Sequence, residues 1–260
     1  MESELITHVL FYSTSFTFNN PLIKQQINFT CQNKVHIGGN WICDPARIMS
    51  VANEKADNKK WGWQKKNKFA KKECIVYISG GNEMEFGHQF LDYSLARMVE
   101  SHDFGEIGID SLACEVHVFA PNVQEIPEER HGLFIHNWGF RPGNKMSMGL
   151  AADNSTAIAF KTLEETIDEL QHAGRISMLI VDCEGCEWDF YTDIISLEEP
   201  IHQVILQMHG TPYMANELFL AMQEEGYVIF HREAEHTGKG EVWDYSWLKL
   251  PPQFFNWKEV

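Results

Sequence analysis

The chain has 260 residues, enough for one α/β domain with a short extension and too few for two complete enzyme domains. Acidic residues outnumber basic ones by 37 to 21, and the net charge of -16 argues against broad binding to nucleic acid or to an anionic membrane surface. Its apolar runs are far shorter than the ~20 residues that span a bilayer, so we expect no membrane span.

Residues 1–73 read as an irregular N-terminal extension. The first residues carry Glu2 and Glu4 where a signal peptide has Lys or Arg, so we expect no secretory signal in them. The compartment stays open, because a lumenal location would depend on a segment upstream of this chain. Eight lysines lie within residues 55–72 among three aromatic residues. We interpret them as a solvated amphipathic lead-in, which we favour over a phosphate or nucleic-acid patch.

From residue 74 to residue 260, short β-branched runs alternate with helical patterns, as is typical of βαβ units around a parallel sheet. One predicted helix has Thr162 as its N-cap, Glu165 in the capping-box position and Gly174 as its stop. The sequence therefore predicts one α/β domain with a doubly wound sheet of seven strands. The predicted strands are 74–79, 114–120, 133–139, 177–183, 202–208, 227–233 and 245–250, with further helices over 85–100 and 216–226.

Residues that directly follow the strands are the candidates for ligand binding, because such sheets bind ligands outside the carboxyl ends of their strands. After the first strand, Gly80 and Gly81 allow a sharp turn and a close approach to a ligand. The segment ISGGNEMEF lacks the third glycine of the dinucleotide fingerprint, which disfavours a nicotinamide cofactor. The other candidates at this edge are Asn82, Ala120, Asn137, Trp138 and His209.

The segment MLIVDCEGCEWDFY holds a Cys-x-x-Cys pair, Cys183 and Cys186, among three acids. Negative charge opposes thiolate formation, so we favour packing cysteines over a redox dithiol, and without a second ligand pair we assign no metal site. Asp182 ends a strand, and alternation places Glu184 on the same side. Two like charges there are suited to general acid–base catalysis or to cation binding. The alternative interpretation is that these acids, with Glu187, only enrich the N-terminus of a helix, where the helix dipole favours negative charge.

Several of these segments, taken in order, resemble the FkbM-type family of class I S-adenosylmethionine methyltransferases, in its eukaryotic methyltransferase-like branch. The likeness rests on CIVYISGGNEMEF, CEVHVFAPN, FIHNWGF, the Asp-x-Glu-Gly-x-Glu of VDCEGCEWDF, and LQMHG, and it runs from about Gly38 to Leu250. It implies a Rossmann-like sheet with an antiparallel last strand and methyl transfer from S-adenosylmethionine. We predict O-methylation of a small-molecule or glycan acceptor. The sequence does not indicate an oligomeric state.

The resemblance also assigns roles to the candidate residues. The family has an acid where Ala120 stands, so the resemblance implies cofactor binding weakened by about tenfold to a hundredfold. A catalytically inactive, methyltransferase-like binding domain is therefore the alternative prediction. A disulfide between Cys43 and Cys74 is implied for a lumenal protein. By the resemblance, Gly80, Gly81 and Asn82 contact the methionine end of the cofactor, and the segment at Ala120 contacts its ribose. Asp182 and Glu184 face the reacting methyl group and the acceptor, and His209 is the general base.

Overall fold

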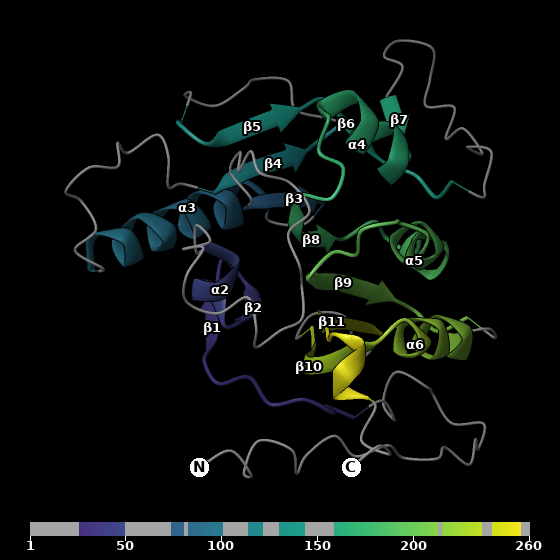
Figure 1. The fold of residues 1–260 in the computed structure, drawn as a ribbon. Helices are drawn as coiled ribbons and strands as arrows, with labels where there is room; N and C mark the ends of the chain where they lie inside the picture. The colour runs from purple at the N-terminus through teal and green to yellow at the C-terminus, as the bar shows by residue number, and fades with distance from the viewer. Residues whose placement is uncertain are drawn as a thin grey trace, which may run out of the picture.

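The computed structural model describes residues 26–49, 74–80, 83–100, 114–121, 130–143, 159–212, 215–235 and 241–255. At its centre is a seven-stranded sheet (Figure 1) with the order β10-β11-β9-β8-β3-β4-β5. Only β11 runs against the other six, because it pairs antiparallel with both β9 and β10. The predicted mostly parallel, seven-stranded sheet with an antiparallel last strand is confirmed. Its strands are β3 (Ile75–Ser79), β4 (Glu115–Phe119), β5 (Leu133–His136), β8 (Ile176–Val181), β9 (Gln203–His209), β10 (Tyr227–Ala234) and β11 (Val242–Lys249).

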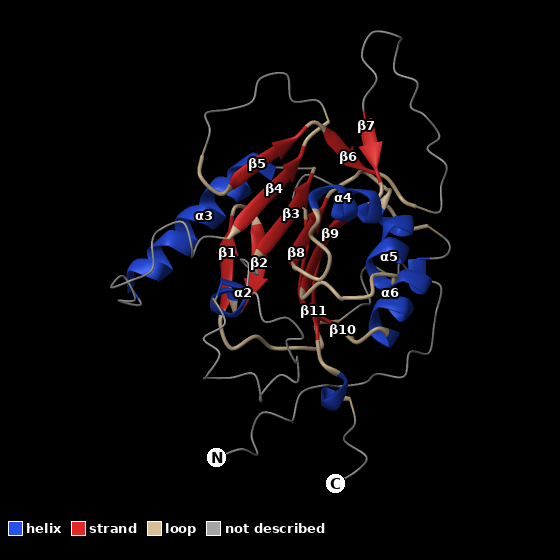
Figure 2. Cartoon of the chain, turned by 45° about the horizontal axis from the view of Figure 1, so that its top comes forward, coloured by secondary structure: helices blue, strands red, loops and turns tan. Residues whose placement is uncertain are grey.

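Helices pack against the two faces of this sheet, as Figure 2 shows. Successive residues of a strand point to opposite faces, so Leu179 and Val181 of β8 join one apolar cluster, and Met178 and Ile180 join the other. This explains why β8 is an unbroken apolar run. Helices α4 (Leu163–Leu170), α5 (Glu187–Ile195) and α6 (Ala215–Glu224) contribute to the first cluster, and α3 (Glu83–Glu100) contributes to the second.

The predicted capping box of α4 is present. The Thr162 side chain accepts a hydrogen bond from the Glu165 N–H, and the Glu165 carboxylate accepts one from the Thr162 N–H. The helix ends earlier than predicted, at Leu170, because Gln171 adopts the left-handed conformation of a C-cap. Gly174, the predicted stop, lies in the turn that leads to β8 and has a φ of +68°.

The N-terminal extension is not irregular throughout. A hairpin of β1 (Lys34–Ile37) and β2 (Asn40–Cys43), followed by α2 (Pro45–Met49), packs on the second face of the sheet. The backbone N–H and C=O of Cys43 both bind the side-chain amide of Gln203 on β9. The predicted boundary at residue 73 and the lysine-rich lead-in lie outside the described residues.

The predicted strand 133–139 is two strands that belong to different sheets. β5 ends at His136, and after the exposed Asn137 the chain continues as β6 (Trp138–Phe140). This second strand pairs in parallel with β7 (Ala159–Lys161) in a small separate sheet. Leaving the main sheet at Asn137 brings β6 beside α4.

All six cysteines form disulfides, in the pairs Cys31–Cys43, Cys74–Cys114 and Cys183–Cys186. The implied Cys43–Cys74 pairing is therefore wrong. Cys183 and Cys186 pack against the first apolar cluster as predicted, but they are also joined in a disulfide, which was not predicted. Cys74 and Cys114 precede two neighbouring parallel strands that are in register, so their Cα atoms lie 4.7 Å apart. Within the described segments, no helix combines the length and apolar character needed to cross a membrane.

Candidate functional site

The strands β3, β8 and β9 end at one edge of the sheet, and this brings Gly80, Asp182 and His209 together. The Asp182 N–H donates to the Ser79 carbonyl at 2.8 Å, which extends the pairing of β8 with β3 by one residue. Gly80 has a φ of +84°, and a Cβ placed on it would lie 1.7 Å from the Asp182 carbonyl oxygen. Only a glycine allows the chain to turn over Asp182 at this distance.

A buried carboxylate, that of Glu187 at the start of α5, holds the backbone and the ring of His209. Its side chain is fully buried. Its Oε1 accepts the His209 backbone N–H at 2.5 Å and lies 3.0 Å from Nδ1 of the same residue. Its Oε2 accepts the Gly185 N–H at 2.8 Å. The carbonyl oxygen of Gln207 is a second acceptor, 3.2 Å from His209 Nδ1.

These contacts determine which ring nitrogen of His209 carries the proton. Both groups beside Nδ1 are acceptors, so the neutral ring keeps its proton there and leaves a lone pair on Nε2. Nε2 lies 3.7 Å from Oδ1 of Asp182, which is too long for a hydrogen bond. His209 thus has the geometry of a histidine oriented by a carboxylate, with its basic nitrogen on the side of Asp182.

Asp182 carries a buried carboxylate oxygen, Oδ1, to which no described residue donates a hydrogen bond. Burial raises the pKa of Asp182, and the negative charge of Glu187 acts in the same direction, while His209 opposes it. A buried acceptor without a donor costs roughly 1–3 kcal/mol. A ligand that donates a hydrogen bond or carries a positive charge would remove this cost.

Glu184 does not lie beside Asp182 in the way that strand alternation predicts. The strand ends at Val181, and Glu184 sits on an exposed turn with a φ of +50°. It reaches Asp182 through its backbone, whose N–H donates to the Asp182 carboxylate. The acid that contacts the His209 ring at Nδ1 is Glu187, which the sequence analysis named only as one of three acids.

The Cys183–Cys186 disulfide closes the same turn. Cys183 Sγ lies 3.3 Å from Oε2 of Glu187, but a disulfide sulfur carries no proton, so this is a contact and not a hydrogen bond. Cys183, Cys186 and Glu187 also lie close enough together to hold a metal ion. Sulfurs joined in a disulfide are not thiolates, however, and do not supply that chemistry. The disulfide instead connects the end of β8 to the start of α5.

The remaining predicted residues lie further along the same edge or outside the described segments. Ala120, at the end of β4, is 4% exposed and packs in the second apolar cluster. Asn137 is exposed after β5. The Trp138 indole N–H points at Thr166 Oγ1 at 3.4 Å, and Nζ of Lys161 lies 3.8 Å from the ring centroid, so both contacts turn this side chain toward α4 and β7. Gly81 and Asn82 fall outside the described residues.

Comparison with known proteins links this architecture to a family. Residues 13–249 match a family model described as a methyltransferase domain. The match begins within the predicted N-terminal extension and ends at Lys249, the last residue of β11, so it includes the β1–β2 hairpin. No curated protein matches the chain.

Proposed function

Because the chain belongs to this methyltransferase-domain family, we propose that it transfers a methyl group from S-adenosylmethionine to a hydroxyl group of a small-molecule or glycan acceptor. We further propose that it belongs to the FkbM-type branch, with a Rossmann-like, doubly wound sheet. The observation that supports transfer to a hydroxyl is the Glu187–His209 pair, because a hydroxyl needs a base to take its proton.

The residues at the end of β3 and β8 suit the cofactor. S-adenosylmethionine carries an ammonium group and ribose hydroxyls, and the buried Oδ1 of Asp182 is an acceptor to which none of the described residues donates. We propose that Asp182 and the Gly80 turn hold the cofactor, together with Gly81 and Asn82. When bound, the cofactor supplies an electrophilic methyl group on a sulfonium sulfur. Ala120 offers no carboxylate to the ribose. We propose that Asn137 and Trp138, which follow β5, contact the cofactor there instead.

His209 is the proposed general base. Its Nε2 would take the proton of the acceptor hydroxyl while the methyl group leaves the sulfonium sulfur for the acceptor oxygen, which would leave S-adenosylhomocysteine as the other product. Glu187 keeps the Nδ1 proton in place and would stabilise the imidazolium that results, since its contact with the ring at Nδ1 is already made. Glu184, exposed on the turn beside Asp182, is proposed to face the acceptor.

Titration calorimetry with S-adenosylmethionine and S-adenosylhomocysteine tests cofactor binding. We expect both to bind the wild-type chain, and Asp182→Asn to weaken binding at least tenfold, because it removes a charged acceptor. The melting temperature should change little, since no described residue donates to Oδ1. Asp168→Asn, at an exposed position of α4, is the matched control and should bind as the wild type does.

The absence of heat with either adenosyl ligand, in folded protein, would overturn the enzyme proposal. It would favour the inactive binding domain, to which the burial of Ala120 among apolar residues points. Binding that is equal in the wild type and in Asp182→Asn would instead show that Asp182 does not contact the cofactor.

We also propose that the protein works in an oxidising compartment. All six cysteines are paired, and stable disulfides persist in such compartments. Peptide mapping of native protein without reductant should recover the three pairs Cys31–Cys43, Cys74–Cys114 and Cys183–Cys186. Recovery of these cysteines as free thiols would contradict the proposal.

A further inference from the structure

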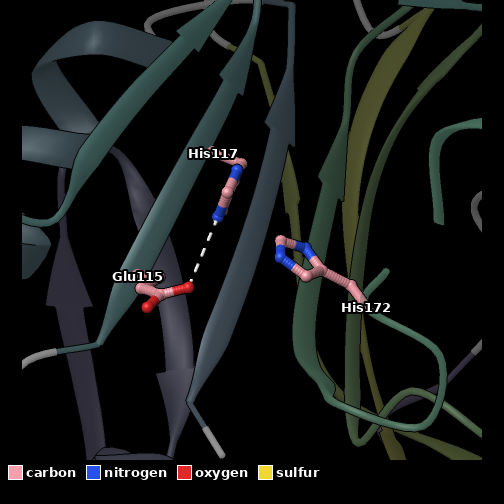
Figure 3. Close-up of side chains that lie close together, drawn as sticks. All are labelled: Glu115, His117 and His172. Atoms are coloured by element: carbon pink, nitrogen blue, oxygen red, sulfur yellow. Dashed lines mark ion pairs between the residues drawn. The ribbon is translucent and has the colours of Figure 1, made fainter. Parts of the chain in front are cut away.

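A group of ionisable side chains lies on the first face of the sheet. It lies near the start of β4, away from the strand ends that form the candidate methyltransferase site. Glu115 and His117 project from β4, and His172 follows α4 (Figure 3). One ligand atom of each lies within 4.8 Å of those of the other two. Glu115 is the first residue of β4, whereas the candidate methyltransferase site lies where the strands end. The group is therefore separate from the proposed cofactor and base residues.

His117 has one ring nitrogen in a hydrogen bond and one to which no described residue is a partner. Its side chain is buried, and its Nδ1 lies 2.9 Å from Nε2 of His136. Its Nε2 is also buried and finds no hydrogen-bond partner among the described residues. Oε2 of Glu115 lies 3.8 Å away, beyond hydrogen-bond distance. This nitrogen faces Glu115 and His172 (Figure 3).

His172 has a similar arrangement. It is 6% exposed, and its Nδ1 lies 2.8 Å from the hydroxyl of Tyr77 on β3. That bond leaves Nε2 as the ring nitrogen that can serve as a ligand. Histidines that bind metals commonly have their other ring nitrogen held by a neighbouring group, which fixes the ring orientation. His136 and Tyr77 are in the position to do this for His117 and His172.

Burial and nearby cationic groups keep the two histidine rings of the group uncharged. Burial lowers the pKa of His117 to about 2, and the neighbouring His172, His136 and Arg175 add to this effect. Burial also lowers the pKa of His172 to about 4, again with Arg175 acting in the same direction. The hydrogen bonds to His136 and Tyr77 use the Nδ1 atoms of the two rings, which leaves the two Nε2 atoms for a metal. Arg175 opposes a cation, while the Glu115 carboxylate provides the one negative charge within the ligand set.

Packing alone accounts for part of this arrangement. The His117 ring stacks on Phe134 and on His136, with ring centroids 4.8 and 5.2 Å apart. Stacking explains the burial of the ring, but it does not satisfy Nε2, and a buried polar atom without a partner costs roughly 1–3 kcal/mol. A ligand at Nε2 would remove that cost.

We propose that Glu115, His117 and His172 form a zinc-binding site that joins β4 to the segment between α4 and β8. Two histidines and a carboxylate are a ligand set of protein zinc sites, and water would complete a tetrahedron. Zinc–ligand bonds of roughly 2.0–2.1 Å place the ligand atoms about 3.3 Å from one another. The side chains would therefore close by about an ångström on binding. Glu115, which is partly exposed, has room to make that movement.

Metal titration of the full chain, stripped with a chelator, tests the site. We expect one zinc ion per chain in competition with a chromophoric chelator, and tetrahedral absorption bands when cobalt replaces zinc. His117→Gln and His172→Gln should each weaken zinc binding at least a hundredfold. His88→Gln, which changes a histidine of α3 on the other side of the sheet, is the control and should bind as the wild type does.

Glu115→Gln covers the case in which the histidine variants fail to fold, because Glu115 is partly exposed and its loss leaves the buried rings in place. It should weaken zinc binding at least tenfold and abolish the rise in melting temperature that zinc gives the wild type. A wild-type chain that binds no zinc overturns the proposal, and so does zinc binding that is unchanged in folded Glu115→Gln. S-adenosylmethionine binding, measured on the same variants, should stay unchanged, so this proposal and the proposed methyltransferase function fail separately.

Discussion

Gly80→Ala should abolish S-adenosylmethionine binding and lower the free energy of unfolding by about 3 kcal/mol or more. The new Cβ would lie 1.7 Å from the Asp182 carbonyl oxygen and 2.7 Å from its carbonyl carbon. Both are backbone atoms, so the end of β8 has to move. That movement breaks the hydrogen bond from the Asp182 N–H to Ser79 and displaces the Asp182 carboxylate. Urea unfolding and titration calorimetry measure the two effects.

Gly39→Ala is the matched control for this variant. Gly39 has a φ of +86°, close to the +84° of Gly80, but a Cβ placed on it meets nothing within 4 Å. It should therefore lose only the roughly 1–2 kcal/mol of the left-handed conformation and should bind the cofactor normally. Equal losses of stability in the two variants would show that the contact with Asp182 is unimportant.

The strands of the main sheet could be predicted because they are short runs of β-branched, aromatic and other apolar residues bounded by turn residues. The N-terminal hairpin could not, since its position depends on contacts distant in sequence, such as those of Cys43 with Gln203. The disulfide pairing depends on strand register in the same way. Cys74 pairs with Cys114 because β3 and β4 are neighbours in register, which no local pattern reveals.

The candidate site was predictable where a rule about strand ends applies. That rule singled out Gly80, Asp182 and His209, which the structure brings together. It did not identify a role for Glu187, because an acid in the first turn of a helix has an ordinary explanation in the helix dipole. Its burial beneath His209 depends on where α5 begins after the turn at Glu184.

The histidine group was also beyond sequence reasoning, which assigned no metal site. Glu115 and His117 share one face of β4, but His172 lies more than fifty residues later, with none of the short spacings that mark zinc ligands. Only the fold of α4 over the first face of the sheet places His172 beside β4.

Glu187→Gln should lower the rate of methyl transfer at least a hundredfold and the stability by about 2–3 kcal/mol. The carboxylate accepts the Gly185 N–H, the His209 N–H and, at Nδ1, the His209 ring. An amide in its place has one acceptor and one donor, so either a backbone N–H or the ring loses its acceptor. The amide NH2 can then donate to Nδ1 of His209, which moves the ring proton to Nε2 and removes the base.

Three measurements separate these effects. Nitrogen-15 NMR of the His209 ring reports which nitrogen carries the proton, and it requires no acceptor. Urea unfolding gives the stability, and release of S-adenosylhomocysteine with a panel of hydroxyl-bearing small molecules and glycans gives the rate. Glu164→Gln is the matched control, since Glu164 is also a first-turn acid, on α4, but is exposed. It loses the same attraction to a helix dipole, so it should change stability by less than about 1 kcal/mol and leave the His209 ring unaltered. A Glu187→Gln chain whose ring proton had moved to Nε2 but which kept the full rate would show that His209 is not the base. A chain that kept the Nδ1 proton would show that Glu187 does not determine the position of that proton.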